Sequence, residues 1–253
     1  MPQPLISARD LVVTSWKQFL QDWKQTLEIS VWLIAPGAIM LAGAYAARPF
    51  TDAATAQISS AVFEAIGFFL TLVITMRLEL FVLRKDRVRS TLPKDLKPIT
   101  KELIFSFLFI ALIELAAIVG GLVAFVLPGI WLAVALMFSR YAFLEDGTRG
   151  IKALEASFAL VKKRWWEVFW RTVACSLVFT PLIVLALFAI TMIISAIAGA
   201  DQAALIFHPS DAVPIDPIAK AIRYTLESIV QVILLPLFVT WQVKLFHALK
   251  DSR

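Results

Sequence analysis

The sequence predicts an all-α integral membrane protein with six transmembrane helices, two amphipathic interfacial helices, and both N and C termini in the cytoplasm. Three observations predict it: the composition, the lengths of the apolar runs, and the distribution of lysine and arginine. Of the 253 residues, 60% are hydrophobic and 17% are charged, whereas a soluble domain has about 45–50% and about 25%. No single soluble core could bury so much apolar side chain, so the excess must face lipid. The composition excludes a disordered chain, a secreted disulfide scaffold and a soluble enzyme.

Six apolar runs are long enough to cross a bilayer, since a helix needs roughly 20 apolar residues to cross about 30 Å of hydrocarbon. These spans cover residues 27–47, 58–83, 103–127, 129–145, 168–198 and 218–246 of a single membrane domain, 1–253. Pro36, Pro181 and Pro236 lie inside the first, fifth and sixth spans, where a proline should kink a helix. Pro128-Gly129 should form a tight external turn between the third and fourth spans.

Lysine and arginine gather on alternate connections. Of the 24, 19 lie in residues 1–26, 84–102, 146–171 and 244–253. The other connections carry Arg48 alone in residues 48–57 and none in residues 200–217. Basic residues favour the cytoplasmic side, so this bias predicts that both termini are cytoplasmic. The net charge of +5 therefore reflects topology, and no nucleic-acid partner is expected.

Two stretches have the pattern of amphipathic helices that lie in the membrane interface. In residues 7–26 the apolar side chains share one helical face, made of Val12, Trp16, Phe19, Leu20, Trp23 and Leu27. In residues 149–165 the corresponding face holds Ile151, Leu154, Phe158, Val161 and Trp165. The stretches align without a gap at an offset of 142, with Ser15 on Ser157. This predicts either a parallel internal repeat or two amphipathic segments that are similar because both lie in the membrane interface.

Basic and aromatic residues beside the spans are candidates for contact with anionic lipid headgroups. One group follows the second span and consists of Arg84, Lys85, Arg87 and Arg89. The other precedes the fifth span and consists of Lys163, Arg164, Trp165 and Trp166. The alternative is that these are solvated segments beside the bilayer. The lipid bilayer is therefore one predicted partner, and a membrane or cytoplasmic protein is another.

The chain contains no metal-ligand cluster, no glycine-rich phosphate loop and no nucleophile elbow. Accordingly, no catalytic, cofactor-binding or metal-binding residue is predicted, and the protein is not expected to be an enzyme. His208 shares the segment 200–217 with three aspartates, and this segment is interpreted as a solvated loop. Cys175 lies in an apolar run and is interpreted as a buried, unreactive thiol.

Charged residues inside the spans need an explanation, since a charge at the bilayer centre costs at least ~2.5 kcal/mol. Glu114 lies 14 residues before Pro128 and Arg140 lies 12 after it. At a rise of 1.5 Å per residue the two are within roughly 3 Å in depth. They are therefore predicted to pair across the hairpin, with Arg77 of the second span as the next partner to test.

A second polar cluster is predicted near the outer surface. Arg223 and Glu227 are i, i+4 neighbours on one helix, and Glu64 of the second span lies at a similar depth. Intramembrane charges of this kind either form a polar path for transport or fix the register of neighbouring helices.

The stretch from Pro128 to Phe169 carries a recognisable pattern. It consists of Pro128-Gly129-Ile130-Trp131-Leu132, Glu145, Gly150, Ala153-Leu154, Ser157, Leu160, Trp165-Trp166 and Phe169. This pattern resembles the membrane domain associated with some bacterial glycerophosphoryl diester phosphodiesterases and with related uncharacterised six-span inner-membrane proteins. Members often carry an arginine near Ala135 and a proline near Tyr141; this chain has neither, and Arg140 is a candidate substitute. Catalysis in the fused members belongs to a separate soluble domain, so the resemblance implies membrane architecture without phosphodiesterase activity. It also implies a location in the bacterial cytoplasmic (inner) membrane.

Two functions are compatible with the sequence. The favoured hypothesis is a non-enzymatic membrane protein that organises or regulates a partner, or membrane lipid homeostasis, through its cytoplasmic face. The alternative is a small transporter or channel that uses Glu114, Arg140 and the proline-bearing spans. An intramembrane lipid enzyme is disfavoured, because the sequence shows no matching nucleophile and base.

Overall fold

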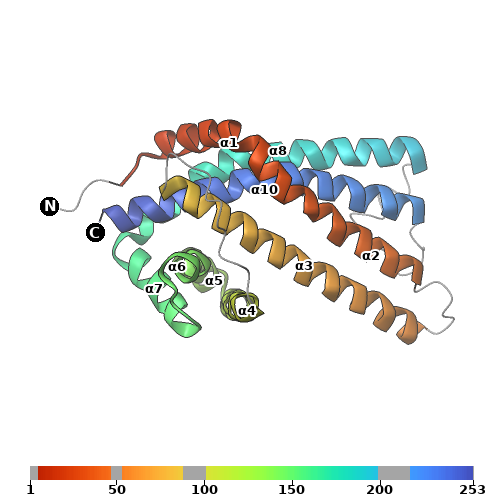
Figure 1. Ribbon diagram of the computed structural model, residues 1–253, viewed down its shortest axis with the longest axis horizontal. Helices are drawn as coiled ribbons and strands as arrows, with labels where there is room; N and C mark the ends of the chain where they lie inside the picture. The colour runs from red at the N-terminus through yellow and green to blue at the C-terminus, as the bar shows by residue number, and fades with distance from the viewer. Residues whose placement is uncertain (1–4, 47–52, 88–100, 199–216, 253) are drawn as a thin grey trace. The chain divides into compact units, whose positions relative to one another are not determined.

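The computed structural model describes residues 5–46, 53–87, 101–198 and 217–252 (Figure 1). All regular elements in these ranges are helical, and six helices are long and apolar enough to cross a membrane. These six are Ala8–Gly43, Ile58–Arg87, Lys101–Ala124, Val126–Asp146, Ile151–Ile197 and Thr225–Asp251. The structure thus confirms the all-α class and the multi-pass membrane character of the chain.

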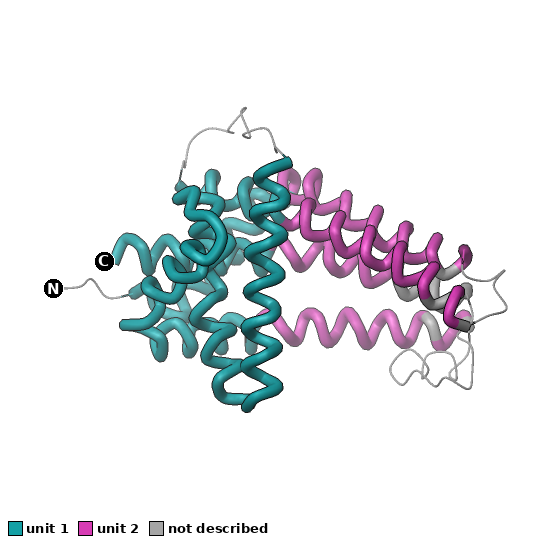
Figure 2. The backbone as a smooth tube through the Cα atoms, turned by 90° about the horizontal axis from the view of Figure 1, so that it is seen from below, with its two compact units in different colours: residues 1–23, 76–178, 237–253 teal, residues 24–75, 179–236 magenta. Residues whose placement is uncertain are grey.

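The elements follow one another without a strand among the described residues. They are α1 (Ala8–Ser30), the 3-10 helix η1 (Val31–Leu33), α2 (Ile34–Ala46), α3 (Ala53–Arg87), α4 (Lys101–Ala124), α5 (Val126–Leu136), α6 (Ser139–Asp146), α7 (Ile151–Val161), the 3-10 helix η2 (Lys162–Arg164), α8 (Trp165–Ala198) and α10 (Pro217–Asp251). The chain divides into two compact units, coloured separately in Figure 2. Unit 1 comprises residues 1–23, 76–178 and 237–253, and unit 2 comprises residues 24–75 and 179–236.

Unit 2 is built from four helical stretches of α1–α2, α3, α8 and α10 (Figure 2). Its core contains Leu33, Ile74 and Val232. Glycines let α2 and α3 approach closely: a Cβ atom added to Gly43 would overlap with the Cβ of Phe63. Small residues at such a crossing are a usual packing device in membranes, where lipid supplies no hydrophobic force between helices.

The junction between α1 and α2 differs from the prediction. The sequence pattern places the end of the interfacial helix near residue 26, whereas α1 continues to Ser30 before the 3-10 turn. Thr26 and Ser30 are buried, and the Ser30 hydroxyl donates a hydrogen bond to the Val232 carbonyl at 2.9 Å. Packing of these small polar side chains therefore sets the junction, which hydropathy alone cannot locate.

The three span prolines have different consequences. Pro36 lies in the first turn of α2, where the missing N–H has no partner to lose within α2. Pro181 and Pro236 lie inside α8 and α10, which continue through them. Prolines are tolerated in membrane helices when neighbouring groups satisfy the freed carbonyl.

In unit 1, α4 and α5 form a helical hairpin whose turn differs from the prediction. Phe125 alone adopts an extended conformation, with φ −163° and ψ 146°. Pro128 lies in the first turn of α5, a position that needs no backbone N–H, so Pro128-Gly129 is not the turn. Gly129 packs against α4 instead: a Cβ atom at this position would overlap with the side chain of Leu122. We call residues 123–128 the hairpin tip.

The fourth predicted span is broken. A turn at Met137 and Phe138 separates α5 from α6. The Phe138 N–H donates to the Ser157 hydroxyl at 3.2 Å, and that hydroxyl donates to the Ala135 carbonyl at 2.8 Å. A single buried side chain of α7 thus satisfies backbone groups that the break would otherwise leave without partners.

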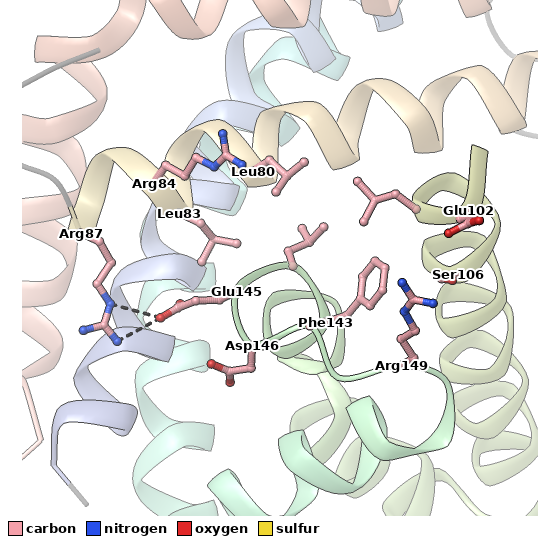
Figure 3. Close-up of a pocket in the computed structure, with 13 residues that line it drawn as sticks. Leu80, Leu83, Arg84, Arg87, Glu102, Ser106, Phe143, Glu145, Asp146 and Arg149 are labelled. Atoms are coloured by element: carbon pink, nitrogen blue, oxygen red, sulfur yellow. Dashed lines mark hydrogen bonds and ion pairs between the residues drawn. The ribbon is translucent and has the colours of Figure 1, made fainter. Parts of the chain in front are cut away.

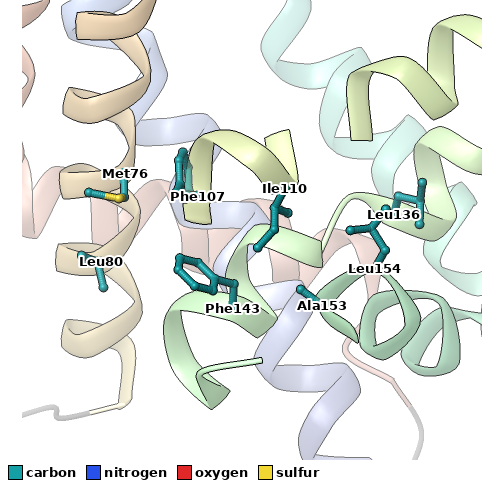
Figure 4. Packing of buried hydrophobic residues seen from close by; sticks show 8 residues of the cluster. All are labelled: Met76, Leu80, Phe107, Ile110, Leu136, Phe143, Ala153 and Leu154. Carbon is teal, nitrogen blue, oxygen red and sulfur yellow. The ribbon is translucent and has the colours of Figure 1, made fainter. Parts of the chain in front are cut away.

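The core of unit 1 joins α3, α4, α5, α6 and α7 (Figure 4). Its buried members are Met76, Leu80, Phe107, Ile110, Leu136, Phe143, Ala153 and Leu154. Outside this core, large apolar side chains of α4 point away from the protein, among them Phe105, Phe109, Leu112, Leu115 and Val119. An apolar outer face of this extent requires a lipid environment, so the protein contacts the bilayer.

Helix α1 exposes large apolar side chains beside charged ones such as Lys17 and Lys24. Trp16, Leu20 and Trp23 are 40–53% exposed, whereas Leu11 and Ser15 on another face are fully buried. Part of the predicted apolar face is therefore exposed, whereas its last residue, Leu27, packs against the core of unit 2. The interfacial position of residues 7–26 stays a prediction. Leu11 and Ser15 align with the fully buried Ala153 and Ser157 of α7 at the 142-residue offset, but the internal repeat itself stays a prediction.

Candidate functional site

A buried ionic triad lies where α3, α4 and α6 meet. Arg140 Nη1 donates to Glu79 Oε1 at 2.8 Å, and Arg140 Nε lies 3.5 Å from Glu114 Oε2. The side chain of Glu79 is 1% exposed. The structure therefore brings together the two residues that the sequence pairs, Glu114 and Arg140, and adds Glu79 as the nearer partner of Arg140.

Glu79 was not predicted as a partner of Arg140, because counting residues from a turn compares the depths of residues within one hairpin only, and Glu79 lies on another helix. Glu79 lies on α3 between the buried Leu78 and Leu80, while Arg77 is exposed. The available signal was a charged residue inside the apolar second span, 58–83. Arg77, the alternative partner suggested by the sequence, points away from the triad.

The carboxylates of the triad are incompletely satisfied. Neither Glu79 Oε2 nor Glu114 Oε2 accepts a hydrogen bond from a described residue. The neighbouring Tyr141 hydroxyl donates to Gln242 Oε1 of α10 at 2.6 Å. The arrangement links four helices through polar contacts, which can fix their register or hold a proton or a small ligand.

A polar cluster around His247, distinct from the predicted outer cluster, joins the ends of α3, α6 and α10. His247 lies between two carboxylates, with Nδ1 2.6 Å from Asp86 Oδ2 and Nε2 2.9 Å from Glu145 Oε2. Lys244 Nζ lies 3.2 Å from Asp86 Oδ1, and Lys250 Nζ lies 3.1 Å from Glu145 Oε1. Both ring nitrogens can donate to carboxylates only when the imidazole is protonated. No site role for this histidine could be predicted from the sequence, because its partners come from helices far apart in the chain.

A cavity of about 540 Å³ lies beside this cluster (Figure 3). Its charged lining consists of Arg84, Arg87, Arg149, Glu102, Glu145 and Asp146. Arg87 is paired, since Nη2 lies 3.1 Å from Glu145 Oε1. Among the described lining residues, three cations face three carboxylates, so this part of the lining has no net formal charge to favour an anionic ligand.

A cavity of about 910 Å³, which we call the basic–aromatic cavity, has a different lining. Its residues are Leu127, Pro128, Trp131, Lys162, Lys163, Arg164, Trp165, Trp166 and Glu167. The Trp165 indole N–H donates to the Trp131 carbonyl at 3.2 Å, and the Trp165 ring stacks on Phe169 with centroids 5.1 Å apart. Three cations and one carboxylate give this lining a formal charge of +2, with three indole rings among the cations.

The other predicted headgroup contacts have varied surroundings. Lys85 Nζ lies 2.7 Å from Asp22 Oδ1, so this lysine ties α3 to α1. Arg164 Nη1 donates to the Ser252 hydroxyl at 2.7 Å, and its Nε lies 3.6 Å from Glu167 Oε1. Arg89 lies outside the described residues.

The predicted outer cluster is described only in part. Glu64 is exposed on α3, and Glu227 is half-buried on α10. The side chain of Arg223 lies outside the described part of the structure, as do residues 200–216. The cluster of Glu64, Arg223 and Glu227 therefore stays a prediction.

Cys175 is a free cysteine and is buried in α8, as the sequence predicts for this thiol. Within the described ranges, no group of three or more His, Cys, Asp or Glu side chains is arranged to hold a metal ion. No family model matches the chain, and no curated protein or solved structure matches it. The resemblance over residues 128–170 thus stays a prediction.

Proposed function

We propose that this multi-pass membrane protein is non-enzymatic and organises membrane lipid, or a partner that depends on lipid, by binding anionic phospholipid through its cytoplasmic face. The observation that carries the proposal is the basic–aromatic cavity. Phosphate is the group that clustered lysine and arginine bind best, and indole rings favour the headgroup level of a bilayer. An apolar edge formed by Leu127 and Pro128 completes a lining suited to an amphipathic ligand.

The placement of this cavity at the cytoplasmic surface is supported by charge asymmetry along the chain. The segments rich in lysine and arginine, including 146–171, alternate with segments that carry almost none. The pattern over residues 128–170 supports membership in the phosphodiesterase-associated membrane family and, with it, a bacterial inner-membrane location. Both are part of the proposal.

The orientation predicts a labelling pattern. A membrane-impermeant thiol reagent added to the external side should modify Ser210→Cys and spare Ser90→Cys, each in a Cys175→Ala background. Both positions lie outside the described residues, in segments of opposite charge character. Labelling of Ser90→Cys alone would reverse the orientation, and labelling of both would contradict the arrangement of spans.

Lipid binding predicts a charge-specific loss. Replacing Lys162 and Lys163 with glutamine should reduce binding of phosphatidylglycerol to the purified protein about tenfold. This corresponds to a loss of about 1.4 kcal/mol of binding free energy for the two substitutions together. The matched control removes two exposed lysines outside the cavity, Lys101→Gln with Lys152→Gln, and should bind as the parent does.

The measurement is displacement of a fluorescent anionic lipid in neutral detergent. Phosphatidylcholine and soluble glycerol phosphate serve as separate competitors, which distinguish a lipid site from a site for free phosphate. Equal losses in the cavity variant and the control would show that only net charge matters and would contradict the proposed site.

A second candidate function is transport through the ionic triad. It is favoured by one observation: two carboxylates on one arginine, each with an oxygen that accepts no hydrogen bond from a described residue. Proton relays in membranes use buried carboxylates of this kind. Proton or solute flux in liposomes that Glu114→Gln abolishes, without loss of folded protein, would favour this function over lipid organisation.

A further inference from the structure

The tip of the α4–α5 hairpin has no polar side chain. Val123, Phe125 and Leu127 are 76–83% exposed. Between Glu114 and Ser139 the sequence contains no charged, amide or hydroxyl side chain. Turns in water are rich in Gly, Asn, Asp and Ser, and the connections 48–57 and 200–217 do carry charged residues. The composition of the tip therefore suits lipid and not an external aqueous turn.

The tip also lies beside cations. The Trp165 indole donates to the carbonyl of Trp131, in the first turns of α5, and the Trp131 ring contacts Phe158 at a centroid distance of 5.4 Å. Leu127 and Pro128 line the same cavity as Lys162 and its neighbours. A fully crossing hairpin would place its turn about 30 Å from the surface at which it entered. A hydrogen bond cannot bridge that distance.

The direction of the helices agrees with this contact. Figure 1 looks along the axis of α4, whereas the C-terminal part of α10 in unit 1 runs across the view. Helix α7 runs beside the hairpin: Gly150 at its start lies next to Phe109 of α4, and η2 at its end borders the hairpin tip. Within unit 1 the axis of α4 therefore runs across that of the C-terminal part of α10, so a bilayer that α10 crosses steeply is not crossed steeply by α4.

We infer that the α4–α5 hairpin is re-entrant: it enters and leaves from the cytoplasmic side, and its tip rests among the acyl chains of the cytoplasmic leaflet. The exposed apolar face of α4 and the hairpin tip form the surface that contacts these chains. This inference rests on the proposed placement of the basic–aromatic cavity at the cytoplasmic headgroup layer. In a re-entrant hairpin neither α4 nor α5 crosses the membrane. Because an even number of crossings is lost, both termini and all basic segments stay on the predicted side.

The test measures where the tip lies in the bilayer. In a Cys175→Ala background, Val126→Cys carries a nitroxide label in proteoliposomes, with Trp166→Cys as the matched position at the edge of the basic–aromatic cavity. Both native side chains are about two-thirds exposed, so the label should not disturb packing. We expect both labels to lie roughly 5–10 Å below the lipid phosphates of the cytoplasmic leaflet, more accessible to oxygen than to a water-soluble nickel chelate.

A second readout is chemical. An impermeant thiol reagent on the external side should leave Val126→Cys unmodified while it modifies Ser210→Cys, and detergent denaturation should expose Val126→Cys fully. External labelling of Val126→Cys, or a nitroxide depth at the bilayer centre, would overturn the re-entrant hairpin. A shallow tip together with unchanged lipid binding after the Lys162→Gln, Lys163→Gln exchange would retain the hairpin and reject the lipid site, so the two proposals fail separately.

Discussion

Arg140→Leu should destabilise the protein by about 3–5 kcal/mol, the typical cost of breaking a buried ion pair by removing one partner. The substitution leaves Glu79 and Glu114 facing each other without the guanidinium that lies 2.8 Å from one and 3.5 Å from the other. The loss should appear in reversible unfolding in mixed micelles. Arg77→Leu is the matched control, because Arg77 is an exposed arginine on α3 and should cost little.

A double-mutant cycle assigns this cost to the correct partner. Adding Glu79→Gln to Arg140→Leu should recover much of the lost stability, because the nearer stranded carboxylate is then neutral. Glu114→Gln alone should cost less than Glu79→Gln alone, since Glu114 makes the longer contact and Arg140 keeps Glu79. A larger cost for Glu114→Gln, or no coupling between Glu79 and Arg140, would contradict the geometry of the triad.

Ser157→Ala should be the second large effect, although it removes a single oxygen atom. It deprives the Phe138 N–H of its acceptor and the Ala135 carbonyl of its donor. Each buried group left unsatisfied costs about 1–3 kcal/mol. Because both groups belong to the break between α5 and α6, the exchange protection of the Phe138 amide should fall together with the melting temperature.

The control for this prediction is Ser15→Ala. Ser15 is as buried as Ser157 and aligns with it at the 142-residue offset, but its hydroxyl has no hydrogen-bond partner among the described residues. Its removal should be neutral or slightly stabilising, because a buried hydroxyl without a partner is itself unfavourable. Equal effects at the two positions would mean that the Ser157 bridge does not support the break.

Part of the candidate site could be predicted from the sequence. Glu114 and Arg140 stand out as charges in apolar runs, and residue counting places them at one depth. The count began from a turn at Pro128-Gly129, three residues beyond the observed turn at Phe125. The pair forms nevertheless, with Arg140 Nε 3.5 Å from Glu114 Oε2. Agreement in this case depended on packing that residue counting does not include.

Other parts of the site could not be predicted. Asp86, Glu145 and His247 come from three helices separated by 59 and 102 positions in the sequence. Each looks like an ordinary charged residue at the end of a helix, where such residues usually meet solvent or headgroups. Their mutual contact follows only from how the ends of α3, α6 and α10 pack together.

The sequence by itself determined that this chain is a membrane protein made of apolar helices. Burial of apolar area depends on composition and on the length of apolar runs, which are local properties of the sequence. It also determined which connections are basic. Only the tertiary structure decided which charges meet, where the fourth span breaks, and that the hairpin tip lies beside Trp165. Those features depend on pairs of residues far apart in the chain, and in a uniformly apolar solvent the hydropathy pattern does not distinguish one helix neighbour from another.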